Sequence, residues 1–289
     1  MNRALALASP MFNKRSKRKP MRQAAELAPF PGVALRVMQL ATEADTGPTD
    51  LIGAMRADAA ISGRILRLAN SSLYGFRQRI DTLSAAGMAL GKTRLVEVTL
   101  ASVVSLYHAP RGYLDGRVSH LLWRRSLATA LCAQGLAAEH GVDPSRTFFA
   151  GLFLPIGLLR FHQVYPPHVV ERVRVAYASG LSGPQAERQV FGLDHIQEGA
   201  RLVRDWELPA WISYSMGESR ATQPIDLVGS CLRKADLVAC SMLHRDGELA
   251  EEDRWSVDMP ALEGMLESGS AEDLMADLRE RTKAFDAAA

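Results

Sequence analysis

The spacing of apolar residues along this chain constrains its fold more than any other feature. No segment alternates polar and apolar residues with the period of two that a half-buried strand shows. Apolar residues instead recur at helical spacing: Ile61, Ile65 and Leu68 fall on one face, and the segment 95–107 is apolar on nearly every side. The pattern predicts an all-α fold with ten or more helices in one compact body.

Helix start and stop signals divide the chain further. The segment 118–141 reads as one long helix ended by Gly141, and Asp143 followed by Pro144 begins the next. Capping boxes at 182-SGPQ-185 and 194-DHIQ-197 open two more helices. Pro224 is expected to start a helix over 224–243.

The most apolar stretch, 148-FFAGLFLPIGLLRF-161, carries a proline in its middle. Pro155 removes one helical N–H and its ring presses on the carbonyl of residue 151, which costs about 3 kcal/mol in a helix interior. Gly151 gives the backbone room to bend. The sequence therefore predicts a kinked core helix. The apolar runs are shorter than the roughly 20 residues of a membrane helix, so no membrane-spanning segment is expected.

The charges and cysteines indicate the class of protein. The formal net charge is +2, but the segment 13-NKRSKRK-19 holds five basic residues and no acidic one, so the rest of the chain is mildly acidic. This argues against a broad nucleic-acid-binding surface and predicts a basic disordered tail over 1–20. Three cysteines without paired spacing, Cys132, Cys231 and Cys240, indicate reduced thiols and a cytoplasmic protein.

Short catalytic signatures are missing from the sequence. It contains no H-E-x-x-H zinc motif, no glycine loop for phosphates, no G-x-S-x-G and no cysteine–histidine zinc spacing. Any function must therefore be read from longer and more dispersed patterns.

Several separated motifs form one such pattern. In the first half they are 27-LAPFPGVALRVMQLA-41, 58-DAAISGRILRLANSSLYG-75 and 80-IDTLSAAGMALG-91. In the second half they are 123-WRRSLA-128, 150-AGLFLPIGLL-159, 191-FGLDHIQEGARLVRDWELP-209 and 233-RKADLVA-239. Together they closely resemble the HDOD family, the HD-related output domain of bacterial signalling proteins.

The resemblance implies a multi-helical HD-like bundle and sets domain bounds. It covers about residues 25–243, so we expect an HDOD domain over 21–245. An acidic segment with a terminal helix capped by Ser270 should follow over 246–289, packing on the domain or trailing it. The family's landmarks fall on Pro29, Pro31, Asn70, Ser71, Tyr74, Gly75, Gly91, Trp123, Gly151, Asp194, His195, Gly199, Trp206, Pro209 and Asp236.

The resemblance also implies that a metal site has been lost. Related HD phosphohydrolases use a histidine, a His–Asp pair and a distant aspartate to hold divalent ions that activate water. Here the first histidine position is Arg125 and the pair is Leu154–Pro155; a further histidine pair of the HD-GYP relatives falls near Ser219–Arg220. His195 and Asp236 survive. Leucine and proline side chains offer no lone pair and a guanidinium repels a cation, so we expect no metal, no other cofactor and no enzymatic activity.

Arginines near the lost site keep a ligand hypothesis open. Arg124, Arg125 and Arg160 lie on or beside segments that would have bordered the metal cleft. Guanidinium groups there could bind a phosphate without hydrolysing its ester. The alternative to the main hypothesis is therefore a module that binds a nucleotide, for example a cyclic dinucleotide.

The sequence thus predicts a non-catalytic bacterial signal-transduction or regulatory protein that acts through protein–protein contacts. We expect a signalling protein as its partner, and self-association is a further contact that the sequence permits. The nucleotide-binding module is the first alternative, and a residual phosphohydrolase is the second.

Overall fold

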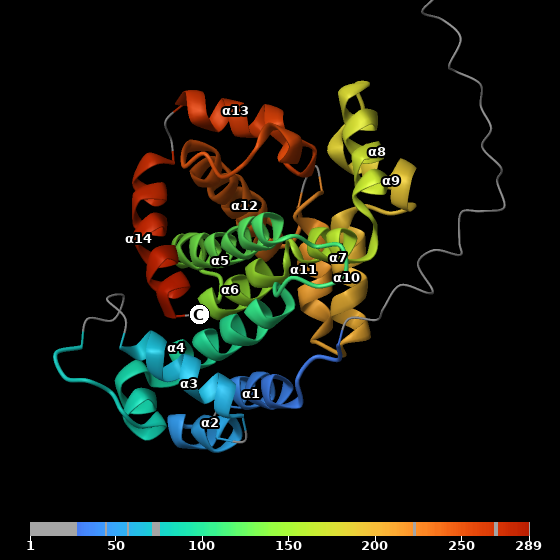
Figure 1. The fold of residues 1–289 in the computed structure, drawn as a ribbon. Helices are drawn as coiled ribbons and strands as arrows, with labels where there is room; N and C mark the ends of the chain where they lie inside the picture. The colour runs from blue at the N-terminus through green and yellow to red at the C-terminus, as the bar shows by residue number, and fades with distance from the viewer. Residues whose placement is uncertain are drawn as a thin grey trace, which may run out of the picture.

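The described part of the chain is built from helices alone. The computed structural model describes residues 28–43, 45–56, 58–70, 76–221, 224–268 and 271–288. Within these ranges there are fourteen α-helices, one short 3-10 helix and no strand (Figure 1). The all-α prediction is confirmed. The predicted tail over 1–20, the landmarks Ser71, Tyr74 and Gly75, and the cap Ser270 lie outside the described residues.

The helices follow one another with short connections. The first group is α1 (Gly32–Thr42), α2 (Pro48–Met55), α3 (Ala59–Ala69), α4 (Leu83–Tyr107), α5 (Gly116–Glu139), α6 (Pro144–Phe153) and α7 (Ile156–Val164). The second group is α8 (Pro167–Ala178), α9 (Gly183–Phe191), α10 (His195–Asp205), α11 (Ala210–Glu218), α12 (Leu227–Arg245), the 3-10 helix η1 (Glu251–Ser256), α13 (Met259–Ser268) and α14 (Glu272–Ala288).

Side-chain caps fix most of the expected helix starts. The Asp143 carboxylate accepts the N–H of Ser145 at 2.9 Å, and capping boxes open α9 and α10 as predicted. The prediction that Pro224 starts a helix is wrong: α12 begins at Leu227, because Asp226 caps it by accepting backbone N–H groups of the first turn. Leu227 is the first residue of this helix and its side chain is exposed.

The apolar stretch with the proline forms two helices rather than one kinked helix. Helix α6 ends at Phe153 and α7 begins at Ile156, with Leu154 and Pro155 as the turn between them. Pro155 provides the carbonyl that starts α7, accepting the N–H groups of Leu158 and Leu159. The two helices together are long and apolar enough to cross a membrane by length and composition, but most of this stretch is buried inside the fold, as in the core of a soluble protein.

Glycines set the closest helix crossings. A Cβ at Gly151 would lie 2.6 Å from the Cα of Ala130, so this glycine allows α6 to pack closely on α5. A Cβ at Gly157 would lie 1.9 Å from the carbonyl oxygen of His195, which joins α7 to α10. Gly91 has φ +73° and separates two helical stretches within α4. Gly151 therefore lets α6 pack closely against α5, in addition to giving the backbone room at Pro155.

Aromatic and amide side chains tie the N-terminal helices to the centre. The ring of Trp206 lies 5.5 Å from Phe30 and 4.8 Å from Tyr107, and the Tyr107 hydroxyl donates to the carbonyl of Pro29. Asn70 bonds both the N–H and the carbonyl of Ile80, and so closes the loop after α3. Several family landmarks thus have structural roles.

The C-terminal segment packs on the bundle. Helix α14 contacts α3, α5 and α12, and α13 contacts α12 (Figure 1). Arg279 pairs with Asp246 at 2.7 Å, and Arg281 donates to Gln134 of α5. The 3-10 helix η1 contacts α8 and α9. Residues 255–260, from the end of η1 into α13, line the candidate functional site.

Candidate functional site

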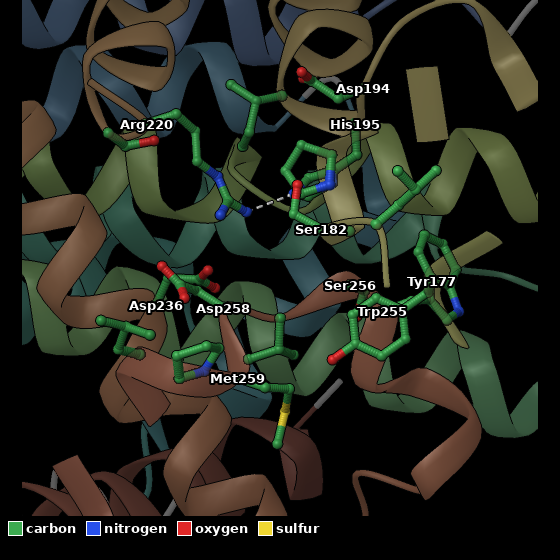
Figure 2. Close-up of a pocket in the computed structure, with 18 of the residues that line it drawn as sticks. Tyr177, Ser182, Asp194, His195, Arg220, Asp236, Trp255, Ser256, Asp258 and Met259 are labelled. Atoms are coloured by element: carbon green, nitrogen blue, oxygen red, sulfur yellow. Dashed lines mark hydrogen bonds between the residues drawn. The ribbon is translucent and has the colours of Figure 1, made fainter. Parts of the chain in front are cut away.

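Four of the positions that the resemblance to HD phosphohydrolases marks as ligand positions line one cavity of about 800 Å³. Leu154 enters it from the α6–α7 turn, His195 from the start of α10, Arg220 from just after α11, and Asp236 from α12. Figure 2 shows Arg220 reaching to the His195 ring, with Asp236 and Asp258 beneath it in this view. Residues separated by more than 80 positions in the sequence therefore share one site.

Arg125 binds the surviving aspartate from behind the cavity wall. Its Nε and Nη2 donate to the two carboxylate oxygens of Asp236, each at 2.8 Å, in a bidentate ion pair. Its Nη1 donates to the carbonyl and hydroxyl of Ser256 at 3.2 and 3.3 Å. Arg125 is 3% exposed. Both carboxylate oxygens of Asp236 thus accept hydrogen bonds from the guanidinium group of Arg125.

This ion pair determines the charge states at the base of the site. Burial alone would raise the pKa of the Asp236 carboxyl, but the charge and hydrogen bonds of Arg125, and more weakly the charge of Arg220, hold it below its ordinary value. Burial lowers and Asp236 raises the pKa of Arg125, and the net shift is upward. Burial also raises the pKa of the nearby Cys240 thiol to about 12, so this thiol stays protonated.

His195 is held on both ring nitrogens. Nδ1 lies 2.7 Å from Glu187 Oε1, and the backbone N–H of His195 donates to the same carboxylate at 2.6 Å. Nε2 lies 2.9 Å from Nη2 of Arg220. Because a guanidinium only donates, Nε2 is the acceptor and the ring proton is assigned to Nδ1. The lone pair through which this histidine could bind a metal points at a cation.

The donor set at this site does not fit a metal ion. Leu154 and Pro155 have no donor atoms, and the donor atoms of Asp236 and His195 are bound by Arg125 and Arg220. Among the described residues, no group of three or more His, Cys, Asp and Glu side chains is arranged to hold a metal. Arg125 and Arg220 therefore occupy the donor atoms of Asp236 and His195 that a metal ion would need.

Two of the three arginines proposed for phosphate lie elsewhere. Arg124 pairs with Glu248 and lies 4.0 Å from Asp246, and Arg160 lies 3.9 Å from the buried carboxylate of Glu198. Neither lines the cavity. Arg125 lies beside the cavity, but its guanidinium N–H groups already donate hydrogen bonds to Asp236 and Ser256. The arginines that line the cavity are Arg188, Arg220 and Arg233.

Other residues of the site were not found from the sequence. Glu187, fully buried in α9, orients His195, although a glutamate in a helix normally indicates a solvent-exposed position. Trp255, Ser256, Asp258 and Met259 come from the C-terminal segment and complete the cavity wall. No local pattern marks either contribution, because both depend on packing between distant segments.

The matching family model identifies the chain. The model of the HDOD domain matches residues 27–221. The protein belongs to the HDOD family. The match covers the cavity up to Arg220, while Asp236 and the wall from Trp255 to Met259 lie beyond the matched residues.

Solved structures share the HDOD fold of this protein at low identity. An HDOD domain protein of unknown function from Geobacter sulfurreducens has a TM-score of 0.72 and 20% identity, covering 92% of this chain and 95% of that one. A candidate phosphohydrolase from Shewanella amazonensis has a TM-score of 0.67 and 20% identity, covering 94% and 98%. A candidate signal transduction protein from Marinobacter aquaeolei has a TM-score of 0.63 and 19% identity, covering 90% and 58%. No curated protein matches the chain.

Proposed function

We propose that this HDOD protein is a cytoplasmic regulatory protein that hydrolyses no phosphate ester and acts through contacts with a signalling protein. The observation that carries the proposal is the pairing of both surviving ligand side chains with guanidinium groups, Asp236 with Arg125 and His195 with Arg220. Metal-assisted hydrolysis needs free carboxylate and imidazole donors around the ion. The neighbours' names include both a phosphohydrolase and a signal transduction protein. The pairing of Asp236 and His195 with arginines favours a role in signal transduction.

An exposed apolar corner supports a role in protein contacts. Ile225, in the connection before α12, is 86% exposed, and Leu227, the first residue of α12, is 57% exposed. The backbone N–H of Ile225 donates to Glu218, one helical turn after the exposed Tyr214 of α11. This hydrogen bond joins the end of α11 to the connection before α12, and exposed large apolar side chains in one part of a surface are typical of protein interaction sites. We call Tyr214, Ile225 and Leu227 the α11–α12 corner.

Partner capture tests this proposal. The immobilised full chain is incubated with lysate of its source organism, beside the variant Ile225→Glu/Leu227→Glu and the control Met88→Glu, which changes an equally exposed apolar residue on α4. We expect a specific protein to bind the wild type and the Met88 variant, and to be lost from the corner variant. Capture that the corner variant retains, or no protein enriched above an empty matrix, would contradict the proposal.

A second candidate function, ligand binding, is favoured by the cavity itself. A hollow of about 800 Å³ beside Arg220 is within the size range of small-molecule sites. The proposal of nucleotide binding through Arg124, Arg125 and Arg160 moves to Arg220, because Arg124 and Arg160 lie outside the cavity and Arg125 is bound to Asp236. Such a site would let a small molecule modulate partner binding.

A further inference from the structure

Among the residues that the structure describes, the charged side chains that line the cavity are paired, with one exception. Of the carboxylates that line it, Asp194 pairs with Arg188, Asp236 with Arg125, and Asp258 lies 3.8 Å from Arg233. Arg220 forms no ion pair with a carboxylate among the described residues; its hydrogen-bond partner there is the His195 ring. The carboxylate that balances it, Glu187, lies on the far side of that ring and does not line the cavity.

The geometry of Arg220 leaves donors for a ligand. Only Nη2 is bonded to His195, and within the described part of the chain no hydrogen bond involves Nε or Nη1. The residue is exposed and lines the cavity. A guanidinium with two donors remaining can bind a planar or tetrahedral oxyanion through two oxygens.

Another part of the cavity lining is apolar, and Figure 2 shows Trp255 and Met259 of this part across from Arg220. Leu181, Leu237, Val257, Met259 and Pro260 line it together with the indole of Trp255. This wall suits the apolar or aromatic body of a ligand. Asp194, Asp236 and Asp258 line the same space, but each is already paired with an arginine. Among the described residues, Arg220 is therefore the lining arginine that no carboxylate pairs with, and one anionic group on a ligand would match it.

We propose that the cavity binds a small organic monoanion, with its one anionic group on Arg220 and its apolar or aromatic body against the Trp255–Pro260 wall. The proposal rests on the ligand-binding candidate function and narrows it. Molecules with one phosphodiester or one carboxylate fit these charges. Nucleoside triphosphates and other polyanions fit them poorly.

Fluorescence titration with anilinonaphthalene sulfonate tests the proposal, because this probe joins one anionic group to an aromatic body. Its neutral analogue N-phenylnaphthylamine reports the apolar wall alone. The proteins are the folded full chain, Arg220→Gln, Arg220→Lys and the control Arg204→Gln, which changes an exposed arginine of α10 outside the cavity. Thermal unfolding of each variant checks that the fold is kept.

We expect saturable binding of the anionic probe, weakened about ten- to hundredfold in Arg220→Gln because a charge-assisted contact is lost. Arg220→Lys should lose less, Arg204→Gln nothing, and the neutral probe should bind all four proteins alike. Cyclic AMP, a monoanion, should displace the probe at lower concentration than ATP. No probe binding, equal binding by Arg220→Gln, a matching loss of the neutral probe, or stronger displacement by ATP would overturn the proposal. Partner capture on the same proteins reports the regulatory role separately.

Discussion

Replacing Arg125 by methionine removes the cation that neutralises Asp236. The side chains of both residues are largely buried, 4% and 13% exposed, and two hydrogen bonds of 2.8 Å join them. Methionine keeps much of the side-chain volume but carries no charge. Asp236 is then left with the more distant Arg220, and the carbonyl and hydroxyl oxygens of Ser256 lose the hydrogen bonds from Arg125, although the hydroxyl still donates to the carbonyl of Asp253.

The expected cost follows from the burial of that pair. Breaking a buried ion pair by removing one partner costs about 3–5 kcal/mol, because an uncompensated charge remains. We expect the lower end, about 3 kcal/mol, because Arg220 still lies near Asp236. In the wild type the pKa of Asp236 is lowered, so the stability it contributes is present above the ordinary value of 3.8 and is lost only in acid. In the variant Arg125 no longer offsets the effect of burial on Asp236, so the free-energy penalty of the charged carboxylate grows as pH rises.

The assay is a double-mutant cycle by urea unfolding at pH 7 with Arg125→Met, Asp236→Leu and the double variant. Removing both charges should cost clearly less than the sum of the single changes, with a coupling energy of at least about 1 kcal/mol. The double variant should also be more stable than Arg125→Met. Additive free energies, or an Arg125→Met variant as stable as the wild type, would refute this account of the site.

Two further predictions concern buried positions outside the cavity. Burial raises the pKa of Glu97 to about 7 despite a hydrogen bond from Gln134, so the stability of the protein should fall as pH rises from about 4.5 to about 7. The free energy of unfolding of Glu97→Gln, measured in urea, should therefore exceed that of the wild type by about 1–3 kcal/mol at pH 8 and equal it at pH 4. Gly157→Ala should lower the stability of the protein by several kcal/mol, because the new Cβ would meet the His195 carbonyl. Gly135→Ala, in α5 with open space around it, should raise the stability by about 0.5–1 kcal/mol. Equal melting temperatures for the two variants would contradict the packing described at Gly157.

Much of the fold could be predicted because its signals are local. The buried face of α3, formed by Ile61, Ile65 and Leu68, follows directly from helical spacing. The caps of α6, α9 and α10 are single residues or short motifs whose donors lie within three positions. The start of α12 was misjudged because Pro224 and Asp226 are both plausible first-turn residues, and the bonds made by Asp226 decided between them.

The site could be predicted only in part. The missing ligands at Leu154 and Pro155 are visible as residue identities, but what replaces them depends on tertiary contacts. Neighbouring helix positions point about 100° apart, so Arg124 reaches Glu248 while Arg125 reaches Asp236. The pairing of Arg220 with His195 likewise joins the turn after α11 to the start of α10, and no spacing within the sequence predicts it.

Metal content tests the central claim most directly. The full chain is produced in medium supplied with iron, manganese, zinc and nickel, desalted, and measured by inductively coupled plasma mass spectrometry, with hydrolysis of bis-p-nitrophenyl phosphate assayed on the same sample. Since Arg125 and Arg220 bind the donors of Asp236 and His195, we predict far less than one metal ion per chain and no turnover above buffer. A tightly held ion near one per chain, with turnover abolished by Asp236→Ala, would contradict the account.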